Sequence, residues 1–122
     1  MTLAIAFKAP EGIVLAADSR VTLTPGAGGG GEPLPQVYFD NATKLLSVKG
    51  RDHVGIVTFG TGAIGQNEPR TAHGFMPEFE EHLEANCKDG TVEQIAKELG
   101  TFFTQQWQQA GMPATGDPMH FI

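Results

Sequence analysis

The stretch Ile13-Val14-Leu15-Ala16-Ala17-Asp18-Ser19-Arg20-Val21-Thr22 decides the fold class. Five apolar residues run up to three polar ones, which is typical of a strand with both faces covered by protein. Before it, residues 3–8 alternate between larger apolar side chains and Ala or Lys, the period of a second strand. Pro10-Glu11-Gly12 supplies turn residues between the two. We therefore predict an opening β-hairpin whose second strand is buried between two layers.

The rest of the chain predicts two more strands and two helices. Strands are expected at 43–48 and 53–59, with residues 49–52 as the hairpin turn, whereas the Gly- and Pro-rich segment 24–36 reads as a loop. Helix formers dominate 77–86 and 91–110, and Thr91 with Gln94 has the form of a capping box. A further strand is expected to begin at 119–122. The fold class predicted for residues 1–122 is a single α+β domain.

Composition limits the function. The 122 residues carry 8 Lys+Arg against 14 Asp+Glu, a net charge of −6 that argues against a nucleic-acid partner. No apolar run approaches the ~20 residues of a membrane span, and the first residues lack a basic leader. Cys87 is the single cysteine and the four histidines are scattered, so we expect a cytoplasmic protein with no disulfide, no metal and no cofactor.

The segment Gly60-Thr61-Gly62-Ala63-Ile64-Gly65 is a G-x-G-x-x-G sequence after a predicted strand. Such a segment lets backbone amides approach a dinucleotide pyrophosphate where a helix begins directly after it. Here Pro69, Gly74 and Pro77 interrupt the region that should be helical. A nucleotide-binding module using Gly60–Gly65 is therefore the weakest of the functions considered.

Thr2 carries a chemistry of its own if Met1 is removed. Its α-amine, with an ordinary pKa of roughly 7.7–8.0, can then accept the proton of the same residue's hydroxyl. A nearby lysine would lower the pKa of that amine by charge repulsion, and a carboxylate would hold the lysine in place. One residue would supply both nucleophile and base.

Thr2, the segment 17–22 and Lys44 resemble, in order and spacing, the proteasome β-subunit family of N-terminal nucleophile hydrolases, including its bacterial relatives. The resemblance implies that Thr2 is both nucleophile and base. It also implies that Asp18 orients the lysine and that Lys44 tunes the pKa of the Thr2 amine. Thr58 falls where the family commonly has the glycine whose N–H stabilises the oxyanion, and Gly60 is the alternative donor. The substrate-binding residues implied are Arg20, Val21, Thr22, Ala42, Ile56, Gly60 and Ile64.

The same resemblance implies a four-layer αββα sandwich, of which these residues correspond to the N-terminal half. It implies a homo-oligomeric ring that cleaves peptides or unfolded proteins, with an ATP-dependent unfoldase as a candidate partner. The resemblance implies that five uncharged residues surround the pocket for the side chain before the cleaved bond: Val21, Ala42, Ile56, Gly60 and Ile64. This predicts a preference for small-to-medium apolar side chains there. The alternative is a catalytically silent structural subunit, or a truncated remnant of the same fold.

Overall fold

The computed structural model of the chain describes residues 3–23, 37–65, 68–115 and 117–122. Thr2 and the predicted loop 24–36 lie outside these ranges. The first described elements form the expected hairpin: β1 (Ala4–Ala9) pairs antiparallel with β2 (Gly12–Ala17), with Ala4 opposite Ala17 and Ala9 opposite Gly12. The alternating pattern therefore predicted this pairing correctly.

Two short strands flank the segment 24–36. β3 (Val21–Leu23) pairs antiparallel with β4 (Val37–Phe39), and this hairpin was not predicted, because each strand is only three residues long. The chain leading out of β4 is fixed to the end of β2, since the Ser19 hydroxyl donates to the Asp40 carbonyl at 2.7 Å and the Ala42 N–H donates to the Ser19 carbonyl at 2.9 Å.

A three-stranded sheet follows, in the order β5 (Leu45–Ser47), β6 (Gly55–Gly60), β7 (Met119–Phe121), with every neighbour antiparallel. The turn between β5 and β6 contains Gly50 at φ +73°, a left-handed conformation that glycine adopts without a Cβ clash. The predicted strands at 43–48 and 53–59 correspond to β5 and β6, and the one expected at 119–122 corresponds to β7.

A short 3₁₀ helix, η1 (His73–Phe75), leads into α1 (Met76–Asn86), and α2 (Val92–Gln109) follows. The predicted capping box is present: the Gln94 N–H donates to Thr91 Oγ1 at 3.3 Å, and the Thr91 N–H donates to Gln94 Oε1 at 2.8 Å. These bonds satisfy N–H groups that the first turn of a helix leaves unpaired. Neither α-helix of the described chain is long and apolar enough to cross a membrane.

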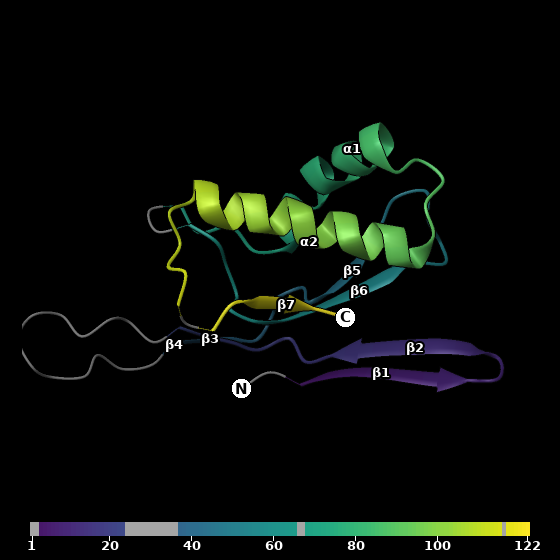
Figure 1. Cartoon of the computed structure of the whole chain (residues 1–122). Helices are drawn as coiled ribbons and strands as arrows, with labels where there is room; N and C mark the ends of the chain where they lie inside the picture. Colours follow the sequence, from purple (N-terminus) through teal and green to yellow (C-terminus); the bar gives the residue numbers. More distant parts are fainter. Residues whose placement is uncertain (1–2, 24–36, 66–67, 116) are drawn as a thin grey trace, which may run out of the picture.

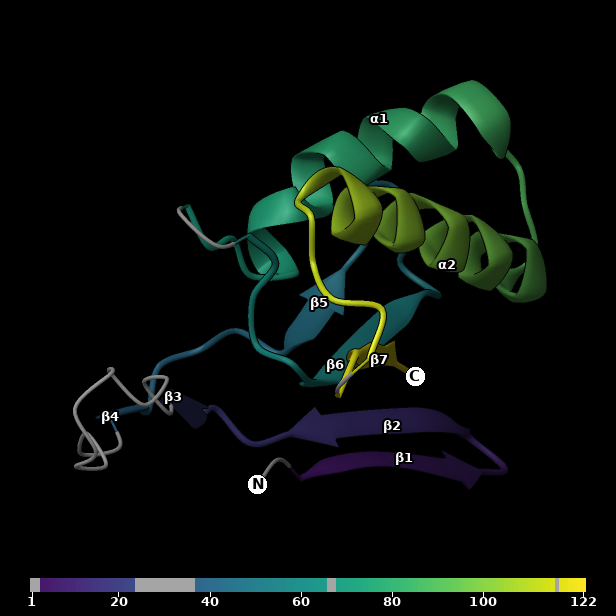
Figure 2. The same cartoon turned by 60° about the vertical axis from the view of Figure 1, so that its left-hand side comes forward.

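The elements stack in layers, with α1 and α2 on one face of the β5–β6–β7 sheet and the β1–β2 hairpin on the other (Figures 1 and 2). Between helices and sheet lies the hydrophobic core, in which Phe79 packs against Phe102 and Phe103 at ring centroid distances of 5.5 and 6.4 Å. The α+β fold with antiparallel hairpins and two helices is confirmed. The described residues form one helical layer and two sheet layers.

The predicted burial of β2 on both faces is wrong for the described chain. Ile13 and Val14 are 67% and 61% exposed. Only the inner face of the hairpin meets another layer: Leu15 lies so close to Gly55 that a Cβ there would be 2.8 Å from Leu15 Cδ1. Val14 shares the outer face with its cross-strand partner Phe7, and no described residue covers that face.

Candidate functional site

Asp18 and Lys44 form the centre of the candidate site. Asp18 follows the last residue of β2 and Lys44 precedes the first residue of β5, so the ends of two sheets bring them together. Lys44 Nζ donates to Asp18 Oδ1 at 3.0 Å, and the side chains are 7% and 28% exposed. A nearly buried ammonium needs such a partner, because burial without one is costly.

Asp18 also accepts hydrogen bonds from two backbone N–H groups. Its Oδ1 accepts the N–H of Leu3 at 3.0 Å, and its Oδ2 accepts the N–H of Arg20 at 3.2 Å. Partial burial alone would raise the pKa of Asp18, but the hydrogen bonds from Lys44, Leu3 and Arg20 outweigh it, so that the pKa lies below its ordinary value. Thr2 lies outside the described residues, and Leu3 follows it directly in the chain.

A second ion pair stands beside the first. Arg20 Nε and Nη2 donate to Asp40 Oδ1 and Oδ2 at 2.5 and 3.0 Å, a bidentate arrangement, and the guanidinium lies 5.6 Å from the ring centroid of Tyr38. The hydrogen bond with Arg20 lowers the pKa of Asp40. The Arg20 carbonyl accepts a further hydrogen bond from Lys44 Nζ, so the arginine backbone helps to fix the lysine.

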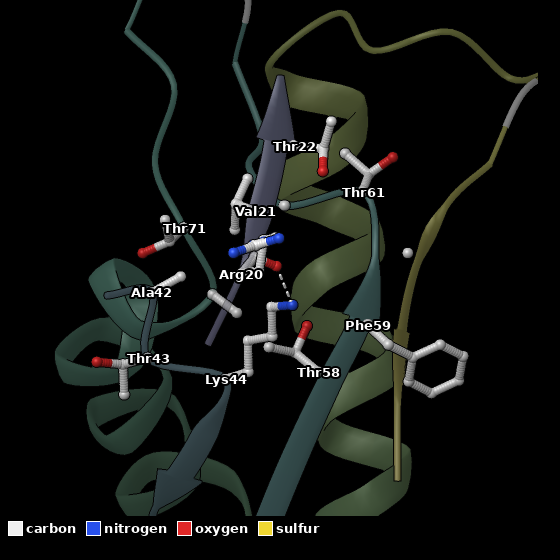
Figure 3. Close-up of a pocket in the computed structure, with 13 residues that line it drawn as sticks. Arg20, Val21, Thr22, Ala42, Thr43, Lys44, Thr58, Phe59, Thr61 and Thr71 are labelled. Atoms are coloured by element: carbon white, nitrogen blue, oxygen red, sulfur yellow. Dashed lines mark hydrogen bonds between the residues drawn. The ribbon is translucent and has the colours of Figure 1, made fainter. Parts of the chain in front are cut away.

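A cavity of ≈ 90 Å³ opens above Lys44 (Figure 3). Seven predicted residues line it: Arg20, Val21, Thr22, Ala42, Lys44, Thr58 and Gly60. The sequence does not predict the other six lining residues, which are Thr43, Phe59, Thr61, Gly62, Thr71 and Ala72. Of these, Thr71 and Ala72 come from the segment before η1, and no local signal in the sequence links that segment to Lys44.

Ile56 and Ile64 do not line the cavity. They are only 4% and 2% exposed and belong to the hydrophobic core beneath the helices. Ile56 lies on the same face of β6 as Thr58, but the helical layer covers it. The prediction that these two side chains surround an apolar pocket is therefore corrected: the observed lining is rich in threonine.

Thr58 also differs from its expected role. Its N–H donates to the Lys44 carbonyl at 2.9 Å as part of the β5–β6 pairing, so this N–H is not available to an oxyanion. The next N–H that points to the same edge belongs to Gly60, two residues on. In the described part of the chain, that N–H has no partner on the cavity side, since the pairing with β5 ends at Thr58.

Glycine is required at position 60. Its φ is +81°, and a Cβ there would lie 2.3 Å from the Pro118 carbonyl oxygen. Residues 61–65 and 68–72 contain no helix, and β6 pairs only with antiparallel strands. The geometry that a dinucleotide-binding glycine motif needs is therefore missing from this region.

Among the residues that the structure describes, no three His, Cys, Asp or Glu side chains gather as a metal site would need. No protein-family model matches the chain, and searches of curated proteins and of solved structures likewise found no match. The function is therefore inferred from the geometry of the site.

Proposed function

We propose that this chain is a threonine-type peptidase subunit of a proteasome-like ring, acting on peptides or unfolded proteins. The observation that carries the proposal is that Asp18 Oδ1 accepts hydrogen bonds from both the Leu3 N–H and Lys44 Nζ, each at 3.0 Å. One carboxylate oxygen thus ties the residue after Thr2 to a nearly buried ammonium. This is the relationship expected where a lysine tunes an N-terminal amine.

The proposed reaction uses Thr2 after loss of Met1. Its neutral amine takes the hydroxyl proton while Oγ1 attacks the substrate carbonyl carbon. The resulting tetrahedral intermediate collapses: the C–N bond breaks, the leaving nitrogen takes a proton from the Thr2 ammonium, and an ester remains on Oγ1. Water then adds to the ester carbonyl carbon while the Thr2 amine takes one of its protons. The bond between that carbon and Oγ1 breaks, Oγ1 takes the proton from the ammonium, and the carboxylic acid leaves with the amine neutral again.

Gly60 is the proposed oxyanion donor. Its N–H points to the cavity edge of β6 and has no partner there in the described chain, whereas the Thr58 N–H is already bonded to Lys44. A backbone N–H fixed in this way can stabilise the negative charge that develops on the carbonyl oxygen.

Turnover of uncharged fluorogenic peptides by the purified, assembled protein tests the proposal. Wild type and Thr2→Ser should release the fluorophore and Thr2→Ala should not, because serine retains a hydroxyl next to the amine. Thr101→Ala, a change on the exposed side of α2, serves as the control and should keep full activity. Equal turnover by Thr2→Ala and wild type would refute the proposal.

The second candidate is a catalytically silent subunit of the same fold. The observation in its favour is the hydrogen bond from the Thr58 N–H to Lys44, which removes the oxyanion donor expected by position. A folded, assembled wild-type protein with no turnover at all, and with Met1 retained, would favour this candidate.

A further inference from the structure

The cavity above Lys44 is lined by five threonines from separate parts of the described chain. Thr22 belongs to β3, Thr43 precedes β5, Thr58 lies in β6, Thr61 follows β6, and Thr71 precedes η1. Ordinary apolar packing does not account for this many hydroxyl groups around one small space. The lining is suited to a ligand that forms hydrogen bonds.

The hydroxyls differ in whether they already have partners. Thr61 donates to the Asp117 carbonyl, and Thr71 Oγ1 accepts the Gly74 N–H at 3.3 Å. By contrast, no side-chain hydrogen bond of Thr22 or Thr58 is found within the described residues. Thr58 is only 8% exposed, and Figure 3 shows its hydroxyl beside the Lys44 ammonium, below Thr22. A nearly buried hydroxyl gains most from a partner supplied by the ligand.

The charges around the cavity are already neutralised. Lys44 is paired with Asp18, and Arg20 is paired bidentately with Asp40. No aspartate or glutamate lies among the described lining residues. A charged ligand side chain would therefore lose its hydration without gaining a counterion of its own.

The walls leave little space. Ala42, Ala72 and Gly60 form parts of the lining, and a Cβ at Gly62 would lie 3.1 Å from Val21 Cγ1, so β3 closely approaches this loop. The cavity of ≈ 90 Å³ is small beside the ~300–1,000 Å³ of sites that take drug-sized ligands. It therefore suits a short side chain such as that of threonine, which has three non-hydrogen atoms.

From these observations we infer that the cavity receives a small hydroxyl-bearing side chain, that of threonine or serine, from the substrate residue on the carbonyl side of the cleaved bond. The Thr58 hydroxyl is the group that selects it, through a hydrogen bond to the ligand hydroxyl. This inference rests on the proposed peptidase function for the place of the residue in the substrate. The recognition itself does not depend on turnover.

Peptide binding tests the inference separately from catalysis. We would titrate the assembled protein with the amides Ac-Ala-Ala-Thr-NH₂, Ac-Ala-Ala-Val-NH₂ and Ac-Ala-Ala-Leu-NH₂, following chemical shifts or heat. Threonine and valine have the same shape, so their difference isolates the hydroxyl. A net hydrogen bond of ordinary strength predicts about 5- to 10-fold tighter binding of the threonine peptide, and leucine should bind more weakly still.

The Thr58→Val variant, equal in size, should abolish the preference for threonine over valine, and Thr58→Ser should retain it. Circular dichroism checks that both variants fold. The binding of the three peptides to the wild-type protein tests the inference even if a variant does not fold. Equal binding of threonine and valine, tighter binding of leucine, or no binding of any peptide would overturn the inference. Selective binding without turnover would support the inference and count against the peptidase.

Discussion

Asp18 Oδ1 and Lys44 Nζ, 26 residues apart in the chain, lie 3.0 Å from each other where the β1–β2 hairpin meets the end of β5. The pair joins the two sheet layers beside Leu3. The same carboxylate oxygen accepts the Leu3 N–H, so Leu3 and Lys44 share one acceptor.

Replacing Lys44 with methionine, which retains the bulk, should reduce peptide turnover by about 100-fold or more if the lysine tunes a general base. Loss of the like charge raises the pKa of the Thr2 amine, so the acidic limb of the pH–rate profile should move to higher pH. Steady-state kinetics across pH measure both effects. Lys97→Met removes a surface ammonium that pairs with Glu93 on α2, and it should change neither. An unaltered profile in Lys44→Met would exclude the lysine from the site.

The Asp18 ion pair should make stability depend on pH in the acid range. The pKa of Asp18 is lower in the folded than in the unfolded chain, where it is about 3.9, so its stabilising contribution is complete above that value. It is lost as the pH falls through the folded-state pKa. The free energy of unfolding of wild type should therefore exceed that of Asp18→Asn at about pH 6, and the gap should narrow towards about pH 3. Urea denaturation at each pH measures the gap, and a constant gap would contradict the assignment.

Two glycines should respond to alanine in opposite ways. At Gly60, φ is +81° and a Cβ would meet the Pro118 carbonyl at 2.3 Å, so Gly60→Ala should destabilise the fold by more than about 1 kcal/mol. At Gly100, inside α2, nothing lies within 4 Å of the added Cβ, so Gly100→Ala should stabilise by about 0.5–1 kcal/mol. Thermal or chemical unfolding of the two variants measures both changes in stability. Equal effects of the same sign would show that the backbone at Gly60 is not constrained.

The capping box should contribute measurably to the second helix. Thr91→Ala removes the acceptor of the Gln94 N–H and should cost about 0.5–2 kcal/mol of unfolding free energy. Thr101→Ala, on an exposed turn of the same helix, provides the matched control and should be close to neutral or slightly stabilising. A larger loss in Thr101→Ala than in Thr91→Ala would refute the role given to the cap.

The sequence predicted local features better than tertiary ones. The hairpin β1–β2, the capping box at Thr91 and the proximity of Asp18 to Lys44 depend on short patterns or on a resemblance in spacing. The contribution of Thr71 to the cavity depends on how the chain crosses from β6 to α1, which no local pattern encodes. Likewise, Ile56 and Thr58 share one face of β6, and only the position of the helices determines which of them is covered.

The pairing of β5 with β6 also determines which backbone N–H groups of β6 are already bonded, and the sequence does not predict this. Alternate N–H groups of a strand point to opposite edges, and the point where pairing ends determines which of them remain free. Among the described residues the pairing of β6 with β5 ends at Thr58, so the next N–H on that edge is that of Gly60. Counting residues along the chain from Lys44 does not show whether the N–H of Thr58 or that of Gly60 is bonded to β5.

Covalent labelling tests the central claim, that Thr2 is the nucleophile, most directly. The assembled wild-type protein would be treated with a peptide β-lactone, followed by intact-mass measurement and mapping of the modified residue. We predict a chain that lacks Met1 and carries a single adduct on Thr2, with no adduct in Thr2→Ala. An unmodified Thr2 in a folded protein, or an adduct that persists in Thr2→Ala, would contradict the account.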